Sequence, residues 1–226
     1  MLFFDSTYII VLPALILAIW AQYKVKYTFN HFSKYRILNG RTAREIARDI
    51  LNYYGLSYVK IERVEGSLTD HYDPRSKVLR LSDDVYESSS IAAIGVAAHE
   101  AGHAIQHNKG YAPLALRNSF VPVVNLVSWA AFPLFILGFF LHNPLFVKLG
   151  IIFFSGVVLF QIITLPVEFD ASRRALKILK SGYLNSYEYE GAKKVLQAAA
   201  LTYIASALMG ILELLRLILI ARGNDD

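Results

Sequence analysis

The chain has 226 residues, a formal net charge of +5, 55% hydrophobic residues and 18% charged residues, and its mean hydropathy is +0.39. This composition is too apolar for an ordinary soluble domain, and the apolar residues are grouped in blocks, which indicates an integral membrane protein. Lys and Arg flank those blocks, so the positive charge is explained by membrane topology and does not indicate nucleic-acid binding. Cysteine is absent, which excludes a disulfide framework.

The first apolar block covers residues 8–23, and residues 2–4 add to its length. A segment of this length can cross about 30 Å of hydrocarbon. A cleaved signal peptide is the alternative, but no basic residue precedes the block and no small-residue cleavage site follows Trp20. We therefore expect residues 1–25 to be a retained N-terminal transmembrane anchor.

A soluble portion is expected over residues 26–119, and it begins with a short amphipathic helix at residues 42–54. Apolar residues recur there at helical spacing. Thr42 and Glu45 form a capping box at the start of this helix, and Gly55 ends it.

Two later segments, residues 58–64 and 77–81, alternate apolar with charged residues, as half-buried strands do. The turn sequence Asp73-Pro74-Arg75-Ser76 lies between them. A small β-hairpin or sheet is therefore predicted. Its exposed edge can bind an extended peptide as an added strand, although a purely structural hairpin explains the pattern equally well.

The most informative motif is His99-Glu100-Ala101-Gly102-His103. It lies in a largely apolar helix that begins after residues 88–90 and ends at residues 108–110. Side chains four residues apart share one helix face, so both imidazoles can bind one Zn²⁺ ion. In HExxH metalloproteases the glutamate is the general base that takes a proton from the water activated by zinc. The motif predicts hydrolysis of a peptide bond with one zinc ion per chain.

Two further apolar blocks, residues 120–141 and 145–167, are each long enough to span a membrane, and His142-Asn143-Pro144 between them is a tight turn. A transmembrane hairpin is therefore expected over residues 120–167. A cytoplasmic segment at 168–197 is expected to follow it.

A fourth span, transmembrane or interfacial, is expected over residues 198–222, before a short tail at 223–226. Glu213 and Arg216 lie within this fourth block at i and i+3, where they can neutralise one another in part.

The distribution of Lys and Arg predicts the orientation. Residues 1–23 contain none, and only Lys148 lies near the hairpin turn. The basic residues that follow the first and third spans are Lys24, Lys26, Lys34, Arg36, Arg41, Arg44, Arg48, Arg173, Arg174, Lys177, Lys180, Lys193 and Lys194. Both basic regions should face the cytoplasm, with the N-terminus and the hairpin turn on the other side of the cell membrane.

A catalytic zinc ion usually has three protein ligands and one open position for water. The candidates for the third ligand are His107, His71, Glu168 and Asp170. On a straight helix His107 is rotated about 80° from His99 and lies about 12 Å further along the axis, so it can hardly reach the same ion. Glu168 ends the third predicted span on the cytoplasmic side, where the HExxH helix is also expected. It is the favoured third ligand.

Three segments together resemble the YugP-like family of membrane zinc metallopeptidases: residues 99–106 (HEAGHAIQ), 68–74 (LTDHYDP) and 168–175 (EFDASRRA). The resemblance covers essentially the whole chain, including the order of the spans. The family is similar in plan to the HtpX and Ste24 proteases, in which a glutamate well downstream of HExxH is the third zinc ligand. The resemblance implies His99, His103 and Glu168 as ligands, in a gluzincin-like site, with Glu100 as the base.

One departure from those relatives is visible four residues after the ligand glutamate. They have an aspartate there, whereas this chain has Ser172. The partner that orients a zinc-binding histidine is therefore expected elsewhere, and Asp170 is the candidate. A donor to the oxyanion of the transition state is also required, and the candidates are His71, Tyr72, Arg173 and Arg174. Each also has a structural explanation, in loop packing or in contacts with lipid headgroups and helix ends.

Overall, the sequence predicts a mainly α membrane protein with about four transmembrane helices and a small zincin-like α+β cytoplasmic portion, which contains the β-hairpin and the HExxH helix. The favoured function is a zinc metalloendopeptidase whose active site lies at the cytoplasmic membrane surface and whose substrate is a protein or peptide. One alternative is a site-2-type protease with HExxH inside the bilayer, but residues 91–105 are too short to span. Another is a non-catalytic membrane scaffold with a vestigial metal site, which would not need Glu100.

Overall fold

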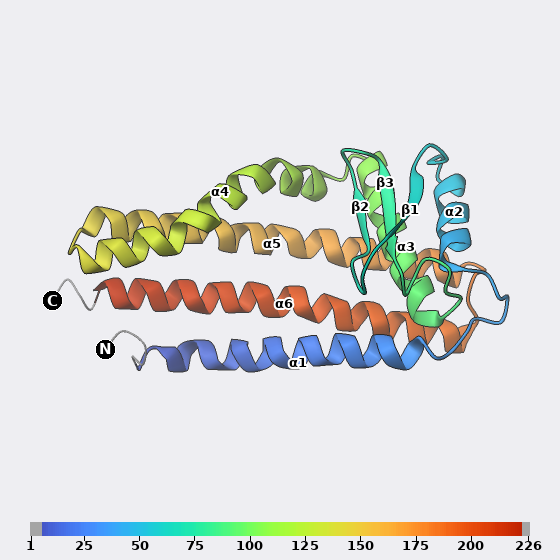
Figure 1. The fold of residues 1–226 in the computed structure, drawn as a ribbon, viewed down its shortest axis with the longest axis horizontal. Coiled ribbons are helices and arrows are strands. Elements are labelled where there is room, and N and C mark those ends of the chain that lie inside the picture. Colours follow the sequence, from blue (N-terminus) through green and yellow to red (C-terminus); the bar gives the residue numbers. More distant parts are fainter. Residues whose placement is uncertain (1–5, 223–226) are drawn as a thin grey trace. The chain divides into compact units, whose positions relative to one another are not determined.

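In the computed structural model, which describes residues 6–222, the chain forms long helices and one small sheet (Figure 1). The helices are α1 (Tyr8–Phe32), α2 (Ala43–Tyr53), α3 (Ile91–Asn108), α4 (Ala112–Phe140), α5 (Pro144–Lys180) and α6 (Ser186–Arg222). The strands are β1 (Lys60–Val64), β2 (His71–Asp73) and β3 (Val78–Ser82). The predicted tail at 223–226 and the predicted contribution of residues 2–4 to the first span lie outside the described residues.

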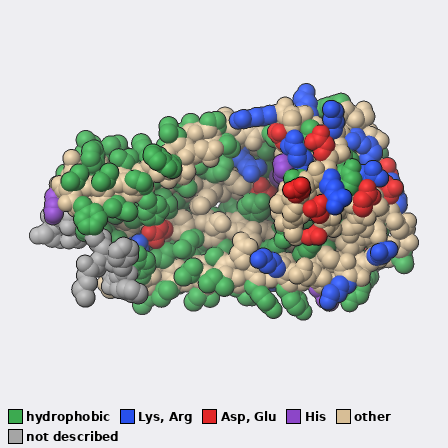
Figure 2. Space-filling view, in the orientation of Figure 1, with side chains coloured by type: hydrophobic (Ala, Val, Ile, Leu, Met, Phe, Trp, Pro, Cys, Tyr) green, Lys and Arg blue, Asp and Glu red, His purple; other side chains and the backbone are tan. Residues whose placement is uncertain are grey.

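The four predicted apolar blocks lie in α1, α4, α5 and α6. Each of these helices is long and apolar enough to cross a membrane. Only 17% of the most apolar window of α1, α4 and α5 is buried inside the protein, so most of their apolar side chains face outward, as lipid-facing helices require. Figure 2 shows hydrophobic side chains covering the surface of α4. The prediction of a mainly helical protein with four candidate spans is confirmed.

The chain divides into two compact units. The first contains Ala115–Pro166 together with the chain up to Gln22 and from Leu201 onward. The second contains Tyr23–Leu114 and Val167–Ala200. Consequently α1, α4, α5 and α6 each contribute residues to both units, and these helices extend beyond the apolar blocks that predicted them.

Within the first unit, α4 and α5 form the expected hairpin. His142 takes a left-handed backbone conformation in the turn (φ 48°), the Asn143 side chain accepts a hydrogen bond from the Leu145 backbone at 3.0 Å, and Pro144 begins α5, where its missing N–H costs nothing. The helices approach closely because Gly150 has no side chain: a Cβ there would lie 2.7 Å from the backbone nitrogen of Phe135. Small residues permit such contacts between membrane helices.

The predicted pairing of Glu213 with Arg216 is also observed. The guanidinium Nη1 donates to Glu213 Oε1 at 2.8 Å, and both side chains are largely buried. The guanidinium carbon also lies 3.6 Å from the centre of the Tyr8 ring. This cation–π contact links α6 to α1 and offsets part of the cost of burying the charge.

The core of the second unit lies around α3. Ser90 caps this helix by accepting a hydrogen bond from the Ala93 backbone at 3.2 Å, and α2 begins with the predicted capping box of Thr42 and Glu45. The core cluster includes buried residues of α1, α2, α3, α5 and α6, such as Phe32, Ile50, Ile94, Leu179 and Val195. Figure 2 shows the charged side chains gathered over the sheet of this unit. A helix-rich core thus holds α3 in place.

The sheet differs from the predicted hairpin. The strands predicted at 58–64 and 77–81 form as β1 and β3, but they pair in parallel, from Lys60 with Val78 to Val64 with Ser82. β2 lies on the other side of β3 and pairs with it antiparallel. The turn at residues 73–76 therefore closes a hairpin between β2 and β3. Residues 71–73, directly before the turn, form the strand that pairs with β3 in this hairpin. Because β2 occupies that edge, β1 pairs with the opposite edge of β3.

A close contact between α3 and α5 lies inside the second unit. A Cβ atom added at Gly102 would lie 2.8 Å from the backbone oxygen of Ala171, which is a steric clash with backbone. By contrast, a Cβ at Gly95, on the same helix, would lie 3.5 Å from the Ala192 side chain, which is ordinary van der Waals contact. Of these two glycines of α3, Gly102 is the one that packing requires.

This difference gives a matched pair of variants. We expect Gly102→Ala to lower the free energy of unfolding by about 1–3 kcal/mol, because α3 must move away from α5. We expect Gly95→Ala to keep or raise it, because alanine favours a helix over glycine by about 1 kcal/mol. Thermal unfolding of the full chain in detergent measures both. Equal melting temperatures for the two variants would contradict the requirement for glycine at position 102.

Candidate metal centre

Three potential metal ligands meet between α3 and α5. His99 and His103 lie four residues apart on α3, and Glu168 lies on α5, directly after the predicted third span. Each residue offers one ligand atom, and these atoms all lie within 4.8 Å of one another. Glu168 Oε2 is 3.3 Å from His99 Nε2 and 3.5 Å from His103 Nε2. The three predicted ligands are therefore brought together.

The spacing and the chemistry of these atoms fit a zinc ion. Two ligand atoms that each lie about 2.0–2.1 Å from a tetrahedral ion are about 3.3 Å apart, which is close to both observed distances. Those distances are long for hydrogen bonds. Two imidazole nitrogens and a carboxylate oxygen also form the ligand set of many catalytic zinc sites.

The centre is shielded from solvent. The exposed fractions of the His99, His103 and Glu168 side chains are 13%, 11% and 3%. Burial alone would lower the pKa of His103, but the carboxylates of Glu168 and Glu100 raise it above its usual value. The two carboxylates therefore favour positive charge on His103 in spite of its burial.

The second nitrogen of each histidine also has a partner. His99 Nδ1 lies 3.1 Å from the hydroxyl of Ser172. His103 Nδ1 lies 3.0 Å from Oε1 of Gln106, which is fully buried. The expectation that the orienting partner lies away from position 172 is therefore wrong for His99: a serine four residues after Glu168 is on the same helix face and reaches the ring. Gln106 was not predicted as a site residue, although its i+3 spacing from His103 could have indicated it.

Asp170 contacts neither histidine directly. Its Oδ2 accepts a hydrogen bond from Gln106 Nε2 at 2.9 Å and another from Arg174 Nε. The Arg174 guanidinium in turn lies 5.7 Å from the centre of the Tyr111 ring. Asp170 therefore acts on His103 only through Gln106. No contact places Arg173 beside the three ligands among the described residues.

Of the other predicted residues, His71 and Tyr72 lie on β2. His71 Nδ1 is 2.8 Å from the Thr69 carbonyl and its Nε2 is 3.4 Å from Arg80, so this exposed ring belongs to the sheet surface. The Tyr72 hydroxyl lies 3.0 Å from His107 Nδ1, and burial raises the pKa of Tyr72 to about 12. As expected, His107 is not part of the ligand cluster.

Two further carboxyl groups, those of Glu100 and Asp70, influence one another electrostatically. Glu100 is 8% exposed and follows His99 directly on α3. Asp70 accepts hydrogen bonds from the backbone and side chain of Ser82, at 2.8 and 2.9 Å. Burial raises the pKa of Asp70, those hydrogen bonds oppose the rise, and the charge of Glu100 adds to it. The electrostatic effect of Glu100 thus reaches both Asp70 and His103.

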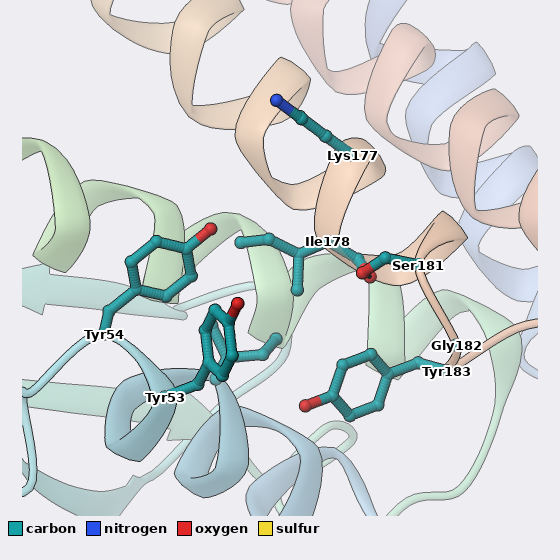
Figure 3. Close-up of a pocket in the computed structure, with 8 residues that line it drawn as sticks. Tyr53, Tyr54, Lys177, Ile178, Ser181, Gly182 and Tyr183 are labelled. Carbon is teal, nitrogen blue, oxygen red and sulfur yellow. Dashed lines mark hydrogen bonds between the residues drawn. The ribbon is translucent and has the colours of Figure 1, made fainter.

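A separate hollow of about 660 Å³ lies between the ends of α2 and α5 (Figure 3). Tyr53, Tyr54 and Tyr183 border it, together with Lys177 and Ser181. Among the described residues that line it there is no histidine and no carboxylate. It is therefore distinct from the metal centre and offers no ligand set of its own.

Comparison with known proteins agrees with this geometry. The chain is 51% identical over 217 residues to "Putative membrane protease YugP" of Bacillus subtilis (strain 168), a match that covers 95% of this chain and 96% of that protein. No solved structure matches the chain. Residues 7–222 match the family described as "Putative neutral zinc metallopeptidase". The cluster of two histidines and a glutamate thus occurs in a chain with four candidate membrane-spanning helices among its described residues, and the chain belongs to this family of membrane zinc metallopeptidases.

Proposed function

We propose that the protein is a zinc-dependent endopeptidase in which His99, His103 and Glu168 hold one Zn²⁺ ion. The observation that carries this proposal is the separation of the ligand atoms, 3.3 and 3.5 Å, which is the spacing of ligands around a tetrahedral ion. Three protein ligands leave a fourth position for a water molecule. Zinc in such a site supplies Lewis acidity, which activates the water and polarises the carbonyl group of the scissile peptide bond.

Glu100 is the proposed general base. It adjoins His99 in sequence, is largely buried, and its charge contributes to the raised pKa of His103, which supports its assignment as the glutamate of the HExxH motif that acts as the base. Glu100 takes a proton from the attacking water as the new carbon–oxygen bond forms. It then delivers this proton to the amide nitrogen as the carbon–nitrogen bond breaks, so the products are a free acid and a free amine.

The proposed substrate is an extended segment of a protein or peptide. β2 is an edge strand of the sheet, and its Tyr72 side chain contacts α3 through His107. A peptide added along the free edge of β2 would form backbone hydrogen bonds and be held in register next to the HExxH helix.

We place the active site on the cytoplasmic side of the membrane, because the basic residues that flank the spans are concentrated in the segments that carry the ligands. Among the residues that the structure describes, the four candidate spans do not include α3. This favours a site outside the bilayer over the site-2-type alternative. The lipid bilayer is then the second expected partner.

Replacing the proposed base tests the reaction. We expect Glu100→Gln to bind one zinc ion per chain, as the parent does, because glutamine removes a base and not a ligand. Hydrolysis should fall by at least about 10²-fold, which is the lower end of what a general base contributes. Metal analysis and turnover of an unfolded soluble protein measure the two properties. An active Glu100→Gln enzyme, or a parent without zinc, would contradict the proposal.

Replacing the proposed third ligand tests the metal site without any substrate. Zinc should raise the melting temperature of the parent. At a free zinc concentration 100 times the Kd, the expected stabilisation is about 2.7 kcal/mol. Glu168→Gln should abolish this rise at the same zinc concentration, because a neutral amide replaces an anionic ligand. Glu190→Gln is the matched control, since Glu190 is an exposed residue of α6 that pairs with Lys193. If zinc stabilises the parent and Glu168→Gln equally, Glu168 is not a ligand.

A further inference from the structure

We propose that Gln106 is a positioning residue that fixes the proton of His103 on Nδ1, so that Nε2 is the atom presented to the metal. This inference rests on the proposed function and assigns a role to a residue outside the ligand set. It is carried by the hydrogen bonds of the Gln106 amide, which is fully buried between α3 and α5.

The orientation of the amide is determined by its partners. Gln106 Nε2 lies 2.8 Å from the backbone oxygen of Val167 and 2.9 Å from Asp170 Oδ2. Both are acceptors: a carbonyl oxygen has no proton to donate, and the Asp170 carboxylate also accepts from Arg174. Only the NH₂ group of an amide can donate to both. The reversed amide would place its oxygen against two acceptors, so it is excluded.

The amide oxygen therefore faces His103 Nδ1 at 3.0 Å. An amide oxygen can only accept, so Nδ1 must carry a proton. In a neutral imidazole one nitrogen is protonated and the other has a free lone pair. The free lone pair is then on Nε2, the nitrogen 3.5 Å from Glu168. The side chain of Asp170 and the backbone of α5 thus select the tautomer of a residue on α3.

His99 provides an internal comparison. Its Nδ1 faces the hydroxyl of Ser172, and a hydroxyl can either donate or accept. Ser172 therefore orients the ring of His99 without fixing its tautomer. The two histidines differ in this respect, although they lie on the same helix face.

The test uses the full chain in detergent with ¹⁵N-labelled histidine. We expect the zinc-loaded parent to show a His103 Nδ1 proton that exchanges slowly with solvent, because it is hydrogen-bonded to the buried amide oxygen of Gln106. In Gln106→Met, which keeps a similar side-chain volume without the amide, this proton should exchange rapidly. Zinc affinity, measured by competition with a chelator, should fall by about 10- to 100-fold. The His103 signal is identified from its loss in His103→Asn.

Two further variants separate positioning from packing. Gln106→Glu keeps an acceptor for His103 Nδ1 but loses both donated hydrogen bonds, so the slow proton should persist while zinc affinity falls. Ser172→Ala should change only the His99 signals. An unchanged His103 proton and zinc affinity in Gln106→Met, or loss of the slow proton in Gln106→Glu, overturns the inference. Failure of the parent to bind zinc would instead reject the proposed function, so the two failures are distinguishable.

Discussion

The close packing of α3 on α5 at Gly102 is the contact on which the candidate metal centre depends. With Gly102 against the Ala171 backbone, residues within about one turn of these two positions come within reach of each other. His99 meets Ser172, His103 meets Glu168, and Gln106 meets Val167 and Asp170. A single helix-to-helix contact therefore places the proposed ligands and also the groups that contact their second nitrogens. A side chain at position 102 would separate all of these pairs together.

Burial of the same candidate centre carries a cost in folding free energy. A carboxylate removed from water costs several kcal/mol unless it is paired, and buried histidines also need partners. The Nδ1 atoms of His99 and His103 are satisfied by Ser172 and Gln106, whereas their Nε2 atoms face Glu168. The groups that point inward are thus the ones suited to share a cation, and the outer hydrogen bonds hold them in that arrangement.

The second unit is built largely from the ends of the long helices. Phe29 and Phe32 of α1, Ala175 and Leu179 of α5, and Ala192 and Val195 of α6 belong to one core cluster with α2, α3 and the sheet. Residues 26–119 and 168–197, which the sequence suggested as separate segments, share this core. Glu168, the proposed third ligand, is consequently part of the same packed unit as α3, which gives the candidate site a rigid support.

The sequence by itself determined the local features. Apolar blocks of sufficient length indicated the four candidate spans, the capping box of Thr42 marked the start of α2, and the spacing of His99 and His103 placed two ligands on one face of a helix. These depend on residues close together in the chain. Only the tertiary structure decided that β1 and β3 pair in parallel, that Ser172 reaches His99, and that Gln106 joins His103 to α5. The reason is that these contacts join segments far apart in the chain, so they depend on how closely helices and strands approach and not on any local pattern.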